Sequence, residues 1–274
     1  IGSCSRNISD NALIMEVIAG EDEKDSTVSQ TPVPKYSQEL NLTRKVKVAC
    51  LRETLDSEAL SEEIRAKTEE VIQNLKREGH TVELTDFPLL KYVLPTYYIL
   101  TTAEASANLS RFDGVKYGYR TPNAHNLESM YKLTRAEGFG EEVKNRIMIG
   151  TYVLSAGYYD AYYLKAQKVR RVITEDFKKA FEEVDVIIGP TTPSPAFKIG
   201  AKTDDPVSMY LNDIYTSSVN LAGLPGISVP CGLVSDLPMG LHIIGKHFEE
   251  SKILQMAHQY QLATSWHNQC PELA

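Results

Sequence analysis

The sequence predicts an α/β fold, in which strands and helices alternate along the chain. Short apolar runs at residues 46–51, 184–188 and 241–244 have the length and composition of buried strands, and longer amphipathic stretches separate them. The chain has 274 residues, of which 42% are hydrophobic and 24% are charged. A chain of this size and composition can bury a large core without a disulfide or metal staple, and its length suits one large domain or two small ones. Of these, we expect a single α/β domain over residues 1–274.

The charge, the apolar runs and the cysteines argue against several classes of protein. The net charge of −7 disfavours a protein that binds nucleic acid non-specifically by neutralising phosphates. No apolar run approaches the roughly 18 residues that cross a membrane. The four cysteines lie far apart and form no CxxC pair, which is typical of reduced cytosolic thiols. We therefore expect a cytoplasmic protein without a membrane partner.

The first part of the chain predicts a helix, a loop and a strand–helix–strand unit. Ser9 is a suitable N-cap, and Val46 and Val48 share one face of the first strand. A helix that begins at Ser57 leads to a second strand, which suits a crossover between parallel strands. The predicted elements are a helix at 10–19, a surface loop at 21–40, a strand at 46–51, a helix at 57–78 and a strand at 81–84.

The remainder predicts several helices and three further strands. Tyr158 and Tyr162, like Tyr159 and Tyr163, are four residues apart and should be neighbours on one helix. The predicted elements are helices at 92–110, 139–154, 157–182, 206–221 and 251–264, strands at 184–188, 227–229 and 241–244, and an irregular segment at 111–136.

The sequence lacks the common catalytic and cofactor-binding motifs. The sequence has no GxSxG motif and no P-loop lysine pattern, and the pair Gly138 and Gly140 lacks the third glycine of a dinucleotide fingerprint. The six histidines form no metal-ligand pattern with one another or with a cysteine. We therefore expect no metal and no cofactor on this chain.

Two segments rich in glycine and proline adjoin buried strands. Residues 189–195 form a loop after one strand, and residues 223–232 place a rigid turn directly before another. Glycine permits positive φ angles and proline fixes φ, so both loops are explained by turn geometry alone. The carboxyl ends of strands are also where ligands bind in open α/β sheets. These loops are therefore compatible with a binding site as well as with a structural role.

Six stretches of the sequence together form a set of motifs. They are residues 6–12 (RNISDNA), 106–114 (SANLSRFDG), 135–140 (RAEGFG), 157–163 (GYYDAYY), 220–226 (NLAGLPG) and 240–245 (GLHIIG). In these stretches the chain resembles the C-terminal portion of the amidase-signature family, and within it the A subunits of glutamyl-tRNA(Gln)/aspartyl-tRNA(Asn) amidotransferases. The SRFDG and EGFG pieces resemble the tRNA-dependent subunits more than general amidases. The resemblance implies a mixed central sheet flanked by helices.

The resemblance also implies a catalytic mechanism whose residues are not in this sequence. The family hydrolyses amides with a nucleophilic Ser, a second Ser on a cis peptide, and a Lys, which lie in or before a Gly/Ser-rich stretch. The 274 residues contain no such stretch, and by the family's order it would precede Ile1. We therefore expect no catalytic residue in this chain, and we expect the chain to be the C-terminal part of a larger domain that is inactive alone.

The resemblance places a glutamine-binding set on Tyr97, Arg146 and Asp213, with Tyr98 as a competing candidate for the tyrosine. The residue types suit a free amino acid, because an Arg fork matches an α-carboxylate and an Asp matches an α-ammonium group. Without the resemblance, Arg146 and Asp213 would be ordinary charges on helix surfaces, and Tyr97 would be a core residue.

By this resemblance, the complete protein would hydrolyse glutamine through an acyl-enzyme and release ammonia. A partner B subunit would use the ammonia with ATP and Mg²⁺ to convert Glu-tRNA(Gln) to Gln-tRNA(Gln), and a C subunit would brace the pair. The misacylated tRNA would bind mainly to the B subunit. Two alternatives remain open, a free-standing amidase of the same superfamily and a non-catalytic ligand-binding or assembly module.

Overall fold

The computed structural model describes residues 2–201 and 206–271. The chain divides into two compact units, of which the first combines Ile1–Lys91 with Thr174–Ala274 and the second is Tyr92–Ile173. Two compact units can belong to one domain, so the single domain that we expect over residues 1–274 stays a prediction. The described ranges contain no helix that is both long and apolar enough to cross a bilayer.

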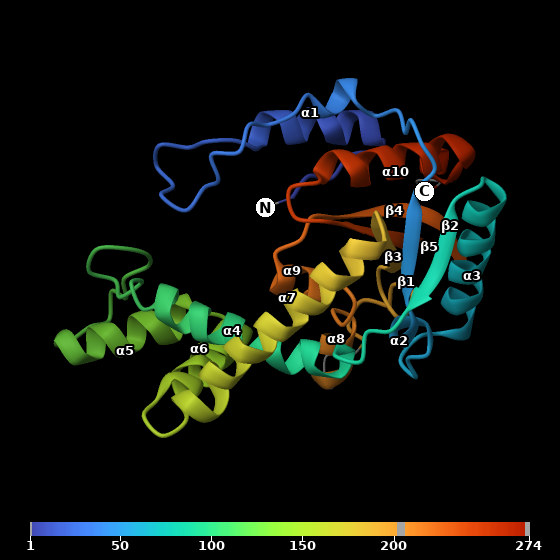
Figure 1. The fold of residues 1–274 in the computed structure, drawn as a ribbon. Coiled ribbons are helices and arrows are strands. Elements are labelled where there is room, and N and C mark those ends of the chain that lie inside the picture. Colours follow the sequence, from blue (N-terminus) through green and yellow to red (C-terminus); the bar gives the residue numbers. More distant parts are fainter. Residues whose placement is uncertain (1, 202–205, 272–274) are drawn as a thin grey trace. The chain divides into compact units, whose positions relative to one another are not determined.

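A five-stranded mixed sheet forms the centre of the first unit, with the strand order β2-β1-β3-β5-β4 (Figure 1). β1 is parallel to both β2 and β3, whereas β5 is antiparallel to both β3 and β4. This sheet, with its flanking helices, confirms the α/β class and the mixed sheet. The strands are β1 (Lys47–Leu51), β2 (Thr81–Thr85), β3 (Val186–Pro190), β4 (Gly226–Val234) and β5 (Leu237–Gly245).

The predicted strand–helix–strand unit is present, but its helix begins later than expected. A short helix, α2 (Arg52–Leu55), directly follows β1, and α3 spans Glu62–Arg77. The N-cap of α3 is Ser61, whose hydroxyl accepts a hydrogen bond from the Ile64 N–H at 3.3 Å, whereas Ser57 lies in the turn before it. The buried residues of α3 recur at helical spacing, and they are Ile64, Thr68, Val71, Ile72 and Leu75.

Two helices at opposite ends of the first unit's sequence lie side by side (Figure 1). They are α1 (Ile8–Ile18) and α10 (Glu250–Ala263), and the Ile8 N–H donates to Gln261 Oε1 at 2.9 Å. The cap of α1 is Asn7, whose side chain accepts from the Asp10 N–H, so the prediction that Ser9 caps this helix is wrong. Asn7 takes this role because its φ and ψ are extended, while Ser9 is already inside the first turn.

Residues 21–40 contain one 3₁₀ helix, Tyr36–Gln38, and are otherwise without helix or strand. Tyr36 and Leu40 are buried, and most of the other side chains are exposed.

The predicted helix at 206–221 is instead two short helices, α8 (Pro206–Leu211) and α9 (Ser217–Ala222), joined by a turn. β4 and β5 form a hairpin whose turn residues, Ser235 and Asp236, have φ angles of 50° and 62°. Two successive positive φ angles define a type I′ turn, which matches the twist of the two strands. The hairpin makes both strands longer than the short apolar runs predict.

The second unit is helical. Its helices are α4 (Leu90–Leu109), α5 (Leu127–Gly138), α6 (Glu141–Leu154), a π-helix (Tyr159–Leu164) and α7 (Lys165–Glu183), of which α4 begins and α7 ends in the first unit. The expectation of an irregular segment over 111–136 is wrong in its second half, because Asn126 and Ser129 form a capping box that starts α5. The tyrosine pairs are neighbours as predicted, with ring centroids 6.0 Å apart for Tyr158 and Tyr162.

Candidate functional site

Arg146 lies on α6, one turn after the start of this helix. Gly140 is the N-cap of α6, and Glu141 and Glu142 occupy its first turn, where negative charge is favoured by the helix dipole. The Arg146 Nε–H donates to Glu142 Oε1 at 2.8 Å, and the arginine side chain is 37% exposed. The guanidinium carbon also lies 5.8 Å from the centre of the Tyr98 ring. Arg146 is thus a partly exposed cation with an ordered environment.

Tyr97 and Tyr98 lie on α4, which packs directly against α6. The two rings meet edge to face, with centroids 5.4 Å apart and planes at 88°. The helices approach closely at Gly150, where an added Cβ would lie 2.0 Å from the Thr102 carbonyl oxygen. The structure therefore brings Tyr97 and Arg146 onto neighbouring helices of one unit. The ring beside the guanidinium is that of Tyr98, the neighbour that the sequence alone does not separate from Tyr97.

Asp213 belongs to the first unit and is exposed. The sequence predicts it on a helix, but the structure places it in the turn between α8 and α9. Its N–H donates to the Tyr210 carbonyl at 3.1 Å, and its carbonyl accepts from the Ser217 N–H at 3.0 Å. Tyr97 and Arg146 lie in the other unit, so the assignment of all three residues to one glutamine site stays a prediction.

A cavity of about 610 Å³ lies in the first unit. Its walls come from the N-terminal segment and α1, from the loop before β4 and β4 itself, and from α10. The segment at 223–232, which the sequence singles out, contributes to one of these walls, and all but its first three residues belong to β4. The other walls come from segments more than 200 residues apart in the chain, and no local pattern in the sequence indicates that they meet.

His242 on β5 reaches this cavity and is 7% exposed. Burial lowers the pKa of its imidazole to about 4, so the ring is neutral at physiological pH. The ring fits against a glycine, because a Cβ on Gly226 would lie 2.8 Å from Nε2. His242 matches no catalytic or metal-binding motif, although it lies in the family-like stretch at residues 240–245 and among the apolar residues of a buried strand.

Ser228 provides a hydroxyl group on this cavity wall, and Thr191 is the partner of that hydroxyl. Ser228 pairs with His242 across β4 and β5, and its Oγ lies 2.7 Å from Thr191 Oγ1. A serine becomes a useful nucleophile when a base accepts its proton, and the partner of Ser228 is a hydroxyl group. This geometry describes a polar cavity wall and not an activated serine. In the part of the chain that the structure describes, no group of three His, Cys, Asp or Glu side chains could hold a metal ion.

Comparisons with known proteins give consistent results. A model of the family described as Amidase matches residues 1–254. The A subunit of the glutamyl-tRNA(Gln) amidotransferase of Geobacillus sp. (strain WCH70) is 57% identical over 274 residues, which are 100% of this chain and 56% of that protein. The protein of the same name from Geobacillus thermodenitrificans (strain NG80-2) is 56% identical, with the same coverage.

A solved structure agrees with these relatives. The crystal structure of the glutamyl-tRNA(Gln) amidotransferase A subunit from Thermotoga maritima is 38% identical in sequence, with a TM-score of 0.73. The similarity covers 93% of this chain and 51% of that one. The chain therefore spans about half the length of the curated relatives that it matches.

Proposed function

The chain belongs to the amidase family, and we propose that it is part of the glutamine-hydrolysing A subunit of a tRNA-dependent amidotransferase. The observation that carries this proposal is its 57% identity, over its whole length, to the A subunit of a glutamyl-tRNA(Gln) amidotransferase. The proposed activity of the complete protein is the release of ammonia from glutamine. That ammonia would convert Glu-tRNA(Gln) to Gln-tRNA(Gln).

We assign the substrate side of this reaction to Tyr97, Arg146 and Asp213. The Arg146 guanidinium would bind the α-carboxylate of glutamine as a fork, and the Asp213 carboxylate would bind the α-ammonium group. A site that binds both the α-carboxylate and the α-ammonium group distinguishes free glutamine from a glutamine residue in a peptide, which lacks both charges. The partly exposed guanidinium beside the Tyr98 ring supports this role for Arg146.

The chemical steps and the partners are proposed for the complete protein. A Ser nucleophile, a cis-Ser and a Lys outside these 274 residues would form and resolve the acyl-enzyme. A B subunit with ATP and Mg²⁺ would carry out the amidation of the tRNA, and a C subunit would brace the complex. A cytoplasmic location follows from the same proposal.

A free-standing amidase with another substrate is the second candidate. Such an amidase belongs to the same family, but its uncharged amide substrate offers neither a carboxylate for Arg146 nor an ammonium group for Asp213. The two candidates therefore differ in what Arg146 and Asp213 contribute.

The test is to compare glutamine-driven with ammonium-driven amidation in the complete amidotransferase that contains this chain. Hydrogen bonds to charged groups contribute about 1.5–3 kcal/mol, so Arg146→Ala and Asp213→Ala should each weaken glutamine use roughly 10- to 150-fold. Ammonium-driven amidation should be unchanged. Lys144→Ala, on the same helix as Arg146, is the matched control and should leave both activities intact.

Two results would contradict the assignment. Normal glutamine use by both variants would show that these residues do not bind the substrate. A parallel loss of glutamine-driven and ammonium-driven activity would show that the residues support the fold and not the glutamine site.

A further inference from the structure

We propose that Glu142 and Tyr98 are positioning residues that orient the Arg146 guanidinium for the α-carboxylate of the substrate. The inference rests on the proposed function, in which Arg146 binds glutamine. Neither the family resemblance nor the candidate site set assigns a positioning role to Glu142 or Tyr98. The inference follows from the contacts of the Arg146 guanidinium group.

The first contact restrains the direction of the guanidinium fork. Glu142 Oε1 accepts from the Arg146 Nε–H at 2.8 Å, and the two residues are one helical turn apart on α6. A guanidinium is planar, so a bond at Nε restrains both the plane of the group and the axis along which its terminal nitrogens point. The Glu142 side chain is 53% exposed, so it lies at the surface beside the arginine and not in the core.

The second contact restrains the same group from the neighbouring helix. The Tyr98 ring lies 5.8 Å from the Arg146 guanidinium carbon, within the range of a cation–π interaction. Tyr98 is itself held edge-on by Tyr97 at 5.4 Å.

The packing of α4 against α6 makes this arrangement rigid. The helices are in close backbone contact at Gly150, and the hydroxyls of Ser106 and Thr151 lie 2.9 Å apart. Tyr98 is on α4 and Arg146 is on α6, and the distance between these two helices is fixed by backbone contact and not by side chains alone.

An acidic residue beside a carboxylate-binding arginine has two opposing effects. Its charge repels the incoming α-carboxylate, while its hydrogen bond holds the fork in place. If Glu142 acts only through charge, its removal should tighten glutamine binding. If it positions Arg146, its removal in Glu142→Ala should weaken glutamine binding. Glu142→Gln should then bind glutamine almost as well as the parent, because an amide oxygen can still accept from the Arg146 Nε–H.

The experiment measures kcat and KM for glutamine in the complete amidotransferase containing this chain, with Glu142→Ala, Glu142→Gln and the control Glu141→Ala. Glu141 is the adjacent acid and pairs with Lys144 at 3.0 Å, so it matches Glu142 in charge and helix position. We expect Glu142→Ala to raise KM for glutamine roughly 10-fold with kcat and ammonium-driven amidation nearly unchanged. Glu142→Gln and Glu141→Ala should stay within about 2-fold of the parent.

Tyr98 provides an independent variant if Glu142→Ala fails to fold. Tyr98→Leu should raise KM for glutamine, whereas Tyr98→Phe, which keeps the aromatic face, should not. Glutaminamide, whose α-carboxamide carries no negative charge, serves as a second substrate, and its use should be the same in the parent and in every Glu142 and Tyr98 variant.

Each outcome decides between the two proposals. If Arg146→Ala leaves glutamine use unchanged, the proposed function of this site fails. If Arg146→Ala weakens glutamine use but Glu142→Ala tightens it or leaves it unchanged, only the positioning role is overturned. Equal KM values for Glu142→Ala and Glu142→Gln, both raised, would also overturn it, because the acceptor that Glu142→Gln keeps for the Arg146 Nε–H would then make no difference to glutamine binding.

Discussion

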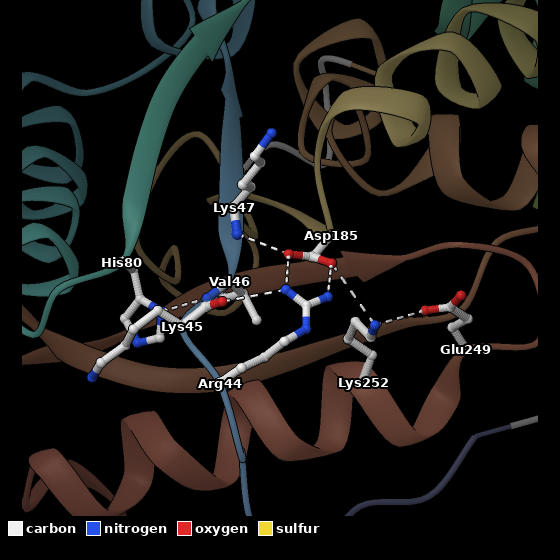
Figure 2. A network of polar contacts seen from close by, with 8 residues as sticks. All are labelled: Arg44, Lys45, Val46, Lys47, His80, Asp185, Glu249 and Lys252. Atoms are coloured by element: carbon white, nitrogen blue, oxygen red, sulfur yellow. Dashed lines mark hydrogen bonds and ion pairs between the residues drawn. The ribbon is translucent and has the colours of Figure 1, made fainter.

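Asp185 accepts hydrogen bonds from both terminal nitrogens of Arg44, at 3.1 and 2.5 Å (Figure 2). The same carboxylate accepts from the Lys47 backbone N–H at 2.8 Å and lies 3.8 Å from Lys252 Nζ. Asp185 immediately precedes β3, Lys47 begins β1, and Lys252 is on α10. One carboxylate therefore joins two parallel strands and a helix that come from distant parts of the sequence.

Asp185→Ala should destabilise the first unit. The Asp185 side chain is 17% exposed, and its loss removes the acceptor of the Lys47 N–H and the carboxylate that faces the Arg44 guanidinium. We expect the free energy of unfolding in urea to fall by about 1–3 kcal/mol. Asp86→Ala is the control, because Asp86 also pairs with an arginine, at 2.7 Å, but is 72% exposed. Asp86→Ala should lower the free energy of unfolding by less than about 1 kcal/mol. An equal decrease in Asp86→Ala and Asp185→Ala would contradict the proposed role of Asp185.

His242 should make the stability of the chain depend on pH below neutrality. Burial lowers the pKa of His242 from 6.5 to about 4 in the folded chain, so the unfolded chain takes up the proton first as the pH falls. Stability should be independent of this group above about pH 6.5 and should decrease between about pH 6.5 and 4, by roughly 3 kcal/mol at the lower end.

The measurement is the free energy of unfolding as a function of pH for the parent chain and for His242→Gln. Because the side chain in His242→Gln stays neutral, the free energy of unfolding should change less steeply with pH between about pH 6.5 and 4 than in the parent chain. His125→Gln replaces an exposed histidine in the second unit and should change the stability of the chain little. An unchanged slope in His242→Gln would show that His242 does not stay neutral in the folded chain.

Gly150→Ala should disturb the packing of α4 against α6. The added methyl group would lie 2.0 Å from the Thr102 carbonyl oxygen and 2.6 Å from Ser106 Cβ, so the backbones must move apart. Overpacking of this kind costs about 1–3 kcal/mol, and it should also raise KM for glutamine in the complete enzyme by displacing Arg146 from Tyr98. Gly140→Ala has no atom within 4 Å of the new methyl group and serves as the control. The measurements are the melting temperature and the KM for glutamine of Gly150→Ala and Gly140→Ala. Equal values for the two variants would show that the close approach at Gly150 is not needed for the packing of α4 against α6.

The 274-residue chain by itself should release no ammonia from glutamine. Its sequence contains no Gly/Ser-rich stretch with the Ser–Ser–Lys set, and the Ser228 hydroxyl in its cavity is paired with Thr191 at 2.7 Å and not with a base. The measurement is ammonia production by the highly purified chain, with the complete amidotransferase as the positive control. Turnover comparable to that of the complete enzyme would show that a nucleophile is present in these residues.

Much of the secondary structure follows from local patterns. The sequence predicts the strands β1 and β2 and the helix α10 within a few residues of their bounds, because alternation and helical spacing are short-range signals. The start of α5 is not predicted, although Asn126 and Ser129 carry a capping signal. The glycines and the proline that precede these two residues favour an irregular segment instead.

The break between α8 and α9 has no local signal. Residues 207–221 contain no glycine or proline, and the turn exists where Tyr215 enters the core and donates its hydroxyl to the Thr54 carbonyl at 3.2 Å. That contact joins residues 161 positions apart, so no window of sequence could reveal it.

The fold class follows from the residues alone, because it depends on composition and spacing. The family follows from the motifs that carry the resemblance, and the residues of the proposed glutamine site are what that resemblance implies. Which of two adjacent tyrosines faces Arg146 is a matter of tertiary packing. Neighbouring residues on a helix point about 100° apart, so the choice between Tyr97 and Tyr98 depends on how α4 is rotated against α6. The same holds for the cavity around His242, whose walls meet because α1, β4 and α10 pack together and not because any local pattern places them there.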